Sequence, residues 1–325
     1  MKTNDIVVSG AVRTPIGRFG GSLKDVPAWE LGGAVIKASL ERAGLAPEYV
    51  DEAVIGQCRQ AGSGPNPART AALKGGLPVS TPAYTVNMAC PSGMKSLMLA
   101  AEAILAGRGE VFIAGGMENM SSIPFLLKNV RWEPIRGGDI VIEDGWSDSV
   151  DPVIDMGMGL TAENLREKYA FSRGDLDAYS LESQRRTAYA REHGWFKDEI
   201  VPLTVPARGK IPEFTFAEDE NGRPDVTLEK LAKLKPSFKA DGIVTPGNSC
   251  GLADGAAAML VTTRDRAEEL GIKPLFSIVS YASVAVENKY MGLGPAAAIP
   301  AALKQAGEDA DSAKLIRLGL KELSR

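Results

Sequence analysis

The sequence predicts an α/β fold whose first half is interrupted by a long insertion. Short β-branched or apolar runs alternate with helical periodicity over the first 120 residues. The composition then changes, between about residues 120 and 241, to charged helical stretches and loops punctuated by proline and glycine. A Gly-rich and then apolar run follows at residues 247–262. We therefore expect the chain to leave a sheet and to re-enter it.

The expected elements follow one another in a regular order. Residues 6–9 are a β-branched strand, and a Gly-rich loop leads to an apolar-periodic helix over residues 28–43, closed by Gly44. A second helix is expected over residues 92–106. Further strands are expected at residues 52–55, 83–87, 111–114 and 256–262. Such alternation favours parallel pairing of the strands.

The block of residues 120–241 is interpreted as an insertion into this α/β half. It contains a charged helical stretch at residues 172–192 and a Pro- and Gly-punctuated loop at residues 202–212. The alternative is a separate helical domain, and the strand-like return of the chain favours the insertion. The predicted boundaries are an N-terminal half, an insertion, a return and a partial second half, at residues 1–119, 120–241, 242–270 and 271–325.

An internal repeat indicates where the second half begins. Residues 38–56 align without gaps on residues 301–319, and both segments consist of a helix end, a glycine, a polar loop and a strand. Chance similarity of two common helix endings is the alternative. If the repeat is genuine, the chain holds one complete half and the start of another, and the position equivalent to Cys90 would follow Arg325.

Charge and cysteine content narrow the class of protein. The net charge is −4, from 37 basic and 41 acidic residues, so we expect no bulk attraction to nucleic acid or to an anionic membrane. No run approaches the roughly 20 apolar residues that a membrane-spanning helix needs. The three cysteines, Cys58, Cys90 and Cys250, are expected to be reduced thiols, and no pair has metal-ligand spacing. We expect a cytoplasmic protein without a metal.

Cys90 is the residue best placed for chemistry. It follows the strand-like residues 83–88 and precedes Pro91, which suits the first turn of a helix because its missing N–H would have no partner there. The positive end of a helix favours a thiolate over a thiol. A small buried hydrophobic residue at a strand end is the alternative interpretation.

The segment around Cys90, Asn-Met-Ala-Cys-Pro-Ser-Gly-Met-Lys at residues 87–95, resembles the nucleophile segment of the thiolase family. Other segments match that family in the same order. They are Arg-Thr-Pro-Ile-Gly at residues 13–17, Ala-Gly-Gly-Met-Glu-Asn-Met-Ser at 114–121, Met-Gly-Leu-Thr-Ala-Glu-Asn at 158–164, Gly-Asn-Ser-Cys-Gly at 247–251, Asp-Gly-Ala-Ala-Ala at 254–258 and Met-Gly-Leu-Gly-Pro at 291–295. The resemblance extends from residue 1 to about residue 310, and the insertion corresponds to the thiolase loop domain that holds coenzyme A.

The resemblance implies an acyltransferase that uses coenzyme A thioesters as substrates and has no permanently bound cofactor. Cys90 would carry the acyl group, and its own backbone N–H would contribute to an oxyanion hole. Relatives of this kind imply a homodimer or tetramer, and a separate C-terminal subunit would be one way to complete the site. The alternatives are a non-catalytic acyl-coenzyme A binding or scaffold subunit and a truncated, inactive thiolase.

The resemblance also implies a set of coenzyme A contacts. Arg223 matches an arginine near the nucleotide end, and Phe238 and Met158 match positions beside the pantetheine arm. Ser249 and Cys250 lie in the segment that faces the pantetheine, and Cys250 stands where many relatives have a serine. Taken without the resemblance, Arg223 could be a solvated turn residue, and the phenylalanine and methionine could be ordinary core residues.

One further position bears on the type of thiolase, and two others could contribute to the active site. Gly157 stands where biosynthetic members often have a histidine, which argues weakly against a strictly short-chain biosynthetic enzyme. Glu118 and Asn119 are expected just after a strand, where active-site groups and an ordinary turn are equally good explanations.

The catalytic segments that follow in the family do not occur in this sequence. They are Asn-Glu-Ala-Phe, Gly-His-Pro and Cys-x-Gly-Gly-Gly, which carry the remaining acid-base groups, so the chain would lack most of the C-terminal half. The one histidine, His193, is expected to be a solvated residue at the end of a charged helix. We therefore expect little turnover from this chain alone.

Overall fold

The computed structural model describes residues 5–128, 130–132 and 138–307, and its centre is a seven-stranded mixed sheet. The strand order is β11-β1-β10-β5-β3-β4, and β2 pairs with β10. The strands are β1 (Ile6–Arg13), β2 (Gly17–Arg18), β3 (Glu52–Gly56), β4 (Ala83–Val86), β5 (Val111–Asn119), β10 (Ala253–Thr263) and β11 (Phe276–Ser277). The strands expected at residues 6–9, 52–55, 83–87, 111–114 and 256–262 are all present, and β1, β5 and β10 are longer than expected.

The expectation of parallel pairing holds only for part of the sheet. Strand β3 is parallel to both β4 and β5, whereas β10 is antiparallel to β1 on one side and to β5 on the other. The register of the β10–β5 pair runs from Asp254 opposite Asn119 to Thr262 opposite Val111. Two parallel neighbours are joined by a crossover connection that returns the chain to the end of the sheet where the first strand began. The long insertion instead returns the chain to the end of the sheet where β5 finishes, so β10 runs antiparallel to β5.

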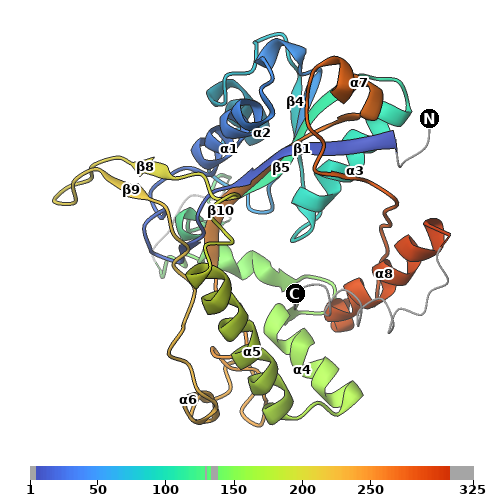
Figure 1. Cartoon of the computed structure of the whole chain (residues 1–325). Coiled ribbons are helices and arrows are strands. Elements are labelled where there is room, and N and C mark those ends of the chain that lie inside the picture. The colour runs from blue at the N-terminus through green and yellow to red at the C-terminus, as the bar shows by residue number, and fades with distance from the viewer. Residues whose placement is uncertain (1–4, 129, 133–137, 308–325) are drawn as a thin grey trace.

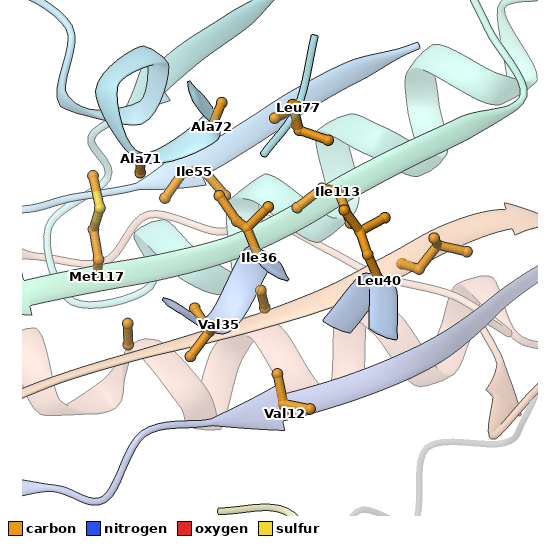
Figure 2. Packing of buried hydrophobic residues seen from close by; sticks show 14 of the residues in the cluster. Val12, Val35, Ile36, Leu40, Ile55, Ala71, Ala72, Leu77, Ile113 and Met117 are labelled. Carbon is orange, nitrogen blue, oxygen red and sulfur yellow. The ribbon is translucent and has the colours of Figure 1, made fainter. Parts of the chain in front are cut away.

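Helices cover both faces of the sheet. The helices α1 (Ala28–Ala43) and α2 (Pro67–Lys74) pack on one face, and α3 (Ser92–Leu105) packs on the other. Alternate residues of β5 therefore enter two separate cores: Ile113 packs with α1 and α2, and Phe112 packs with α3. Figure 2 shows the first of these cores, with Ile36 and Leu40 of α1 directed toward the strands.

The insertion lies between β5 and β10 in the chain. Its elements are η3 (Met120–Ser122), η4 (Gly145–Ser149), β6 (Val150–Asp151), β7 (Met156–Gly157), α4 (Met158–Tyr169), α5 (Arg173–Glu192), β8 (Leu203–Val205), β9 (Phe214–Phe216) and α6 (Leu228–Ala232). Figure 1 shows α4, α5 and α6 gathered on one side of the sheet, away from α1 and α2. The long helix α5 matches the charged helix expected at residues 172–192 and begins with a capping box at Ser172.

Part of the insertion packs back onto the first half. The hairpin β8–β9 contributes Val205 and Phe216 to the core beneath α1. Arg13 at the end of β1 pairs with Glu199 at 2.7 Å and with Asp219 at 2.8 Å. The insertion is therefore tied to the sheet at its middle as well as at its two ends.

The chain after β10 forms α7 (Arg264–Glu269), η5 (Asn288–Leu293) and α8 (Gly294–Gln305), and a short helix η2 (Pro47–Tyr49) precedes β3. In the repeated segments, the two aligned glycines, Gly44 and Gly307, both have left-handed φ, at 66° and 79°. Both helices α1 and α8 thus end in the manner that glycine favours. The strand expected at residues 315–319 lies outside the described residues. Over the described ranges, no helix is long and apolar enough to cross a membrane.

Candidate active site

Cys90 is exposed in the turn that joins β4 to the N-terminus of α3. The turn requires an unusual backbone conformation, because Ala89 has a positive φ of 53°, which costs a residue with a Cβ roughly 1–2 kcal/mol. The hydroxyl of Ser92 compensates by accepting the Met88 N–H at 2.9 Å and donating to the Ala89 carbonyl at 2.5 Å. Such local strain, held by specific bonds, is common at functional sites.

Asn87 connects this turn to a second loop, which follows β3. Its Oδ1 accepts the Ala89 N–H at 2.9 Å, and its Nδ2 donates to the Cys58 carbonyl at 2.9 Å. The Glu118 carboxylate holds the second loop from behind, with Oε2 accepting the Cys58 N–H at 2.8 Å and Oε1 accepting the Arg59 N–H at 3.1 Å. The two loops are therefore fixed to each other next to Cys90.

Burial determines the ionisation of the groups behind Cys90. Burial raises the pKa of the Cys58 thiol, and the neighbouring Glu118 carboxylate raises it further. Burial also raises the pKa of Glu118, against the opposing effect of its two backbone hydrogen bonds. Cys58 is thus held as a neutral thiol at neutral pH, while Cys90 is the more exposed of the two sulfur groups.

Two glycines of the sheet allow the N-terminus of α3 to lie directly on it. A Cβ on Gly56, at the end of β3, would come 2.4 Å from the backbone carbon of Ser92. A Cβ on Gly116 of β5 would come 3.2 Å from the Cα of Gly93. The buried Ser96 hydroxyl then accepts the Gly115 N–H at 2.9 Å and anchors the next turn of the helix. The position of Cys90 therefore depends on close contact between backbones.

The residues expected to contact the pantetheine lie on neighbouring parts of the insertion. Met158 is the first residue of α4 and is 43% exposed, and Phe238 is 49% exposed. The ring of Phe238 packs against Gly159, the residue after Met158. Ser249 and Cys250 are exposed beyond a turn in which the Ser249 hydroxyl donates to the Thr245 carbonyl at 2.8 Å.

Arg223 lies elsewhere on the insertion, on the segment before α6. It is exposed, its backbone N–H donates to the Gln184 side chain at 2.8 Å, and its charge lowers the pKa of Asp225 as a minor contribution behind Lys230. These contacts are with α5 and its own loop, so they do not join Arg223 to the contact between Gly159 and Phe238.

His193 is exposed and caps the C-terminus of α5, as the sequence indicated. Its Nδ1 lies 2.8 Å from the Tyr189 carbonyl, and its ring stacks on Tyr189 with 3.8 Å between the ring centres. Its ring is thus engaged in ending a helix of the insertion.

The structure decides the two positions that the sequence left open. Glu118 and Asn119 belong to β5, so the expectation that they follow the strand is wrong. Glu118 supports the loop beside Cys90. Asn119 is structural, since its Nδ2 donates to the carbonyls of Leu23 and Val26.

Sequence reasoning missed Cys58 and Asn87 as neighbours of Cys90. The one signal present in the sequence was their position after adjacent strands, β3 and β4, which end at the same edge of the sheet because they are parallel.

A cavity of about 450 Å³ lies between α1 and β8, and it is lined by residues such as Leu31 and Leu203 rather than by the expected site residues. Among the described residues, no group of three or more His, Cys, Asp or Glu side chains could hold a metal ion. The turn at Cys90 is the better candidate because it combines an exposed thiol with a constrained backbone.

The fold is that of the thiolases of known structure. The crystal structure of the Bacillus anthracis acetyl-CoA acetyltransferase matches with a TM-score of 0.90 and 43% identity, over 95% of this chain and 78% of that one. The human mitochondrial 3-ketoacyl-CoA thiolase in complex with CoA matches with a TM-score of 0.88 and 39% identity, over 94% of this chain and 76% of that one.

Sequence comparison gives the family. The model of the thiolase N-terminal domain matches residues 6–265. A Staphylococcus epidermidis protein named "Probable acetyl-CoA acyltransferase" is 46% identical over 307 residues, which are 93% of this chain and 77% of the relative. The chain belongs to the thiolase family and is an acyltransferase of the thiolase type.

Proposed function

We propose that this protein transfers acyl groups between coenzyme A thioesters through an acyl intermediate on Cys90. The observation that carries the proposal is the exposed thiol at the N-terminus of α3, in a turn held by Asn87 and Ser92. The names of the relatives favour this reaction over a non-catalytic acyl-coenzyme A binding subunit.

In the first step, the Cys90 sulfur attacks the carbonyl carbon of the thioester and forms a new C–S bond. The C–S bond to coenzyme A breaks, and the proton given up by the Cys90 thiol passes to the departing sulfur. In the second step, the sulfur of free coenzyme A or the enolate carbon of acetyl-coenzyme A attacks the acyl carbon, and the C–S bond to Cys90 breaks. The proton given up by the coenzyme A thiol, or by the methyl group that forms the enolate, passes to the Cys90 sulfur. Covalent catalysis of this kind divides one difficult transfer into two easier ones.

The backbone around Cys90 supports the stabilisation of the oxyanion. Among the hydrogen bonds of the described residues, none uses the Cys90 N–H, so that donor is available to a thioester oxygen. Pro91 has no N–H, and the Ser92 N–H already donates to the Ala89 carbonyl at 3.1 Å. The Cys90 N–H is therefore the donor that we assign to the oxyanion.

The coenzyme A would lie along the insertion. Met158 and Phe238 would pack beside the pantetheine arm, with Ser249 and Cys250 opposite, and Arg223 would meet the phosphates at the nucleotide end. Support comes from the relative solved in complex with CoA and from the contact between Phe238 and the start of α4. A homodimer or tetramer, and a cytoplasmic location, belong to the same proposal.

The test is single acyl transfer from acetyl-coenzyme A, followed by mass spectrometry of the peptide that contains Cys90. We expect acetylation of Cys90 in the wild type and none on that peptide in Cys90→Ala. Acetylation confined to Cys58 or Cys250 in the folded protein would overturn the assignment of the nucleophile.

A further inference from the structure

Two buried carboxylates fix the segment of the insertion that carries Phe238, Ser249 and Cys250. Glu163 in α4 is 2% exposed, and Asp177 in α5 is 4% exposed. A carboxylate is rarely buried unless its oxygens are fully hydrogen-bonded. The hydrogen-bond partners of these two carboxylates lie within residues 243–248, apart from Arg173 on α5.

Glu163 binds the backbone just before the Ser249 turn. Its Oε1 accepts the N–H groups of Ile243 at 2.9 Å and Val244 at 2.8 Å, and its Oε2 also accepts the Ile243 N–H at 3.1 Å. A Cβ on Gly242 would lie 2.3 Å from the Glu163 Oε1, so a glycine at this position permits the approach.

The same backbone reaches Phe238. The Val244 carbonyl accepts the Ser237 N–H at 2.9 Å, which fixes the residue immediately before Phe238. The ring of Phe238 in turn packs against Gly159 in α4, the helix that carries Glu163. Glu163 and Gly159 therefore hold the two sides of one folded segment against a single helix.

Asp177 holds the segment from the other helix. Its Oδ1 accepts the Asn248 Nδ2–H at 3.0 Å, and its Oδ2 pairs with Arg173 at 2.7 Å. Asn248 also donates to the Ile243 carbonyl and accepts the Thr245 N–H, at 2.9 and 2.7 Å. Asn248 directly precedes Ser249, so the restraint acts next to the exposed Ser249–Cys250 turn.

We propose that Glu163 and Asp177 are positioning residues that set the geometry of the pantetheine contacts made by Phe238, Ser249 and Cys250. This inference rests on the proposed function. Neither carboxylate is directed at the substrate, because the oxygens of both are occupied by groups of the segment or, for Asp177 Oδ2, by Arg173. They act on substrate binding by holding Phe238 and the Ser249–Cys250 turn at a set separation from Met158, at the start of α4.

The test measures acyl transfer onto Cys90 of the full 325-residue chain as a function of thioester concentration. In Glu163→Ala, loss of the hydrogen bonds from the Ile243 and Val244 N–H groups should raise the half-saturating concentration about tenfold. The maximal transfer rate and the alkylation rate of Cys90 should stay at the wild-type values. Glu163→Gln should restore saturation to within about twofold, because its amide oxygen can accept the same two N–H groups that bind Oε1.

Asp51→Ala is the matched control for a purely structural role. Asp51 also accepts two backbone N–H groups, those of Glu110 at 2.7 Å and Val111 at 2.9 Å, but at the far end of β5. Its loss should lower the temperature of unfolding without changing the half-saturating concentration. An equal rise in that concentration in Asp51→Ala and Glu163→Ala would overturn the positioning role.

Asn248→Ala provides a second measurement if Glu163→Ala does not fold. It removes the link to Asp177 at a half-buried position and should also raise the half-saturating concentration. Unchanged saturation in the folded variants, with a wild type that saturates normally, would overturn the inference alone. A wild type that neither transfers an acyl group nor binds coenzyme A in a calorimetric titration would overturn the proposed function and this inference with it.

Discussion

The ring of Phe238 lies directly against Gly159, so closely that a Cβ on Gly159 would come 2.3 Å from two of the ring carbons. No side chain fits between them. By contrast, a Cβ on Gly157, two residues earlier, would meet no atom within 4 Å. The two glycines thus differ in whether an added Cβ would displace Phe238, the side chain proposed to contact the pantetheine.

Gly159→Ala should displace Phe238 and weaken coenzyme A binding by about tenfold, the loss of roughly one well-packed apolar contact. Gly157→Ala is the control and should leave the affinity unchanged. Alanine favours a helix over glycine by about 1 kcal/mol, so a general loss of stability is not the expected cause. Calorimetric titration of both variants is the measurement, and equal affinities would remove Phe238 from the site.

Gly56→Ala should push the N-terminus of α3 away from the sheet, because the added Cβ would meet the Ser92 backbone at 2.4 Å. Overpacking of this kind costs about 1–3 kcal/mol in the free energy of unfolding. We expect slower acylation of Cys90 as well. The control is Gly174→Ala, whose Cβ would have its nearest neighbour, the Ser172 hydroxyl, at 3.7 Å. Denaturant unfolding with normal stability in Gly56→Ala would contradict the prediction.

Cys90 should be alkylated before Cys58 and Cys250 at neutral pH. Cys90 is exposed at a helix N-terminus, whereas burial and Glu118 raise the pKa of Cys58 and keep it protonated. Cys250 is exposed but has no such helix end and should react more slowly than Cys90. Limited alkylation with peptide mapping gives the order. Labelling of Cys58 should increase only above the pH range in which an ordinary thiol ionises, because its pKa is raised. Preferential labelling of Cys58 at pH 7 would contradict the assignment.

The capping box of α5 should make stability depend on pH. The Ser172 hydroxyl and backbone N–H lower the pKa of Asp175. An acid whose pKa is lower in the folded state stabilises the fold above its unfolded pKa, about 3.9, and loses this effect as the pH falls through the folded value.

Asp175→Asn should therefore lower the melting temperature at pH 7, and the difference from wild type should shrink below about pH 4. Circular dichroism at the two pH values is the measurement. Ser172→Ala should cause a similar loss at pH 7, and the double variant should be little worse than either single one, since both disrupt the same bond between the Ser172 hydroxyl and the Asp175 carboxylate. A difference that persists unchanged at low pH would refute this account.

Arg223→Ala should weaken coenzyme A binding about two- to fivefold, the range expected of an exposed ion pair. The effect should fall as salt is added, since exposed charges are screened. Arg186 on α5 is also exposed and already pairs with Glu182 at 2.8 Å, so Arg186→Ala is the control for a general loss of positive charge. Equal affinities for Arg223→Ala and wild type would show that Arg223 does not contact the phosphates.

The antiparallel pairing of β10 is the clearest part of the fold that the sequence did not predict. The apolar pattern of residues 256–262 indicates a strand, but a strand pattern is the same in either direction. The direction depends on how the chain returns after the 133-residue span between Asn119 and Ala253. Contacts between such distant segments have no local signature.

Local chemistry determined much of the rest. The spacing of apolar residues and Gly44 predicted α1 at its observed bounds, and Pro91 after a strand predicted the place of Cys90 at the start of α3. These signals act within a few residues, so they can be read from the sequence. Only the tertiary structure brought Cys58 and Glu118 behind Cys90, and Glu163 and Asp177 onto residues 243–248. Those contacts form where separate elements meet, and burial rather than sequence pattern decides which polar groups must pair there.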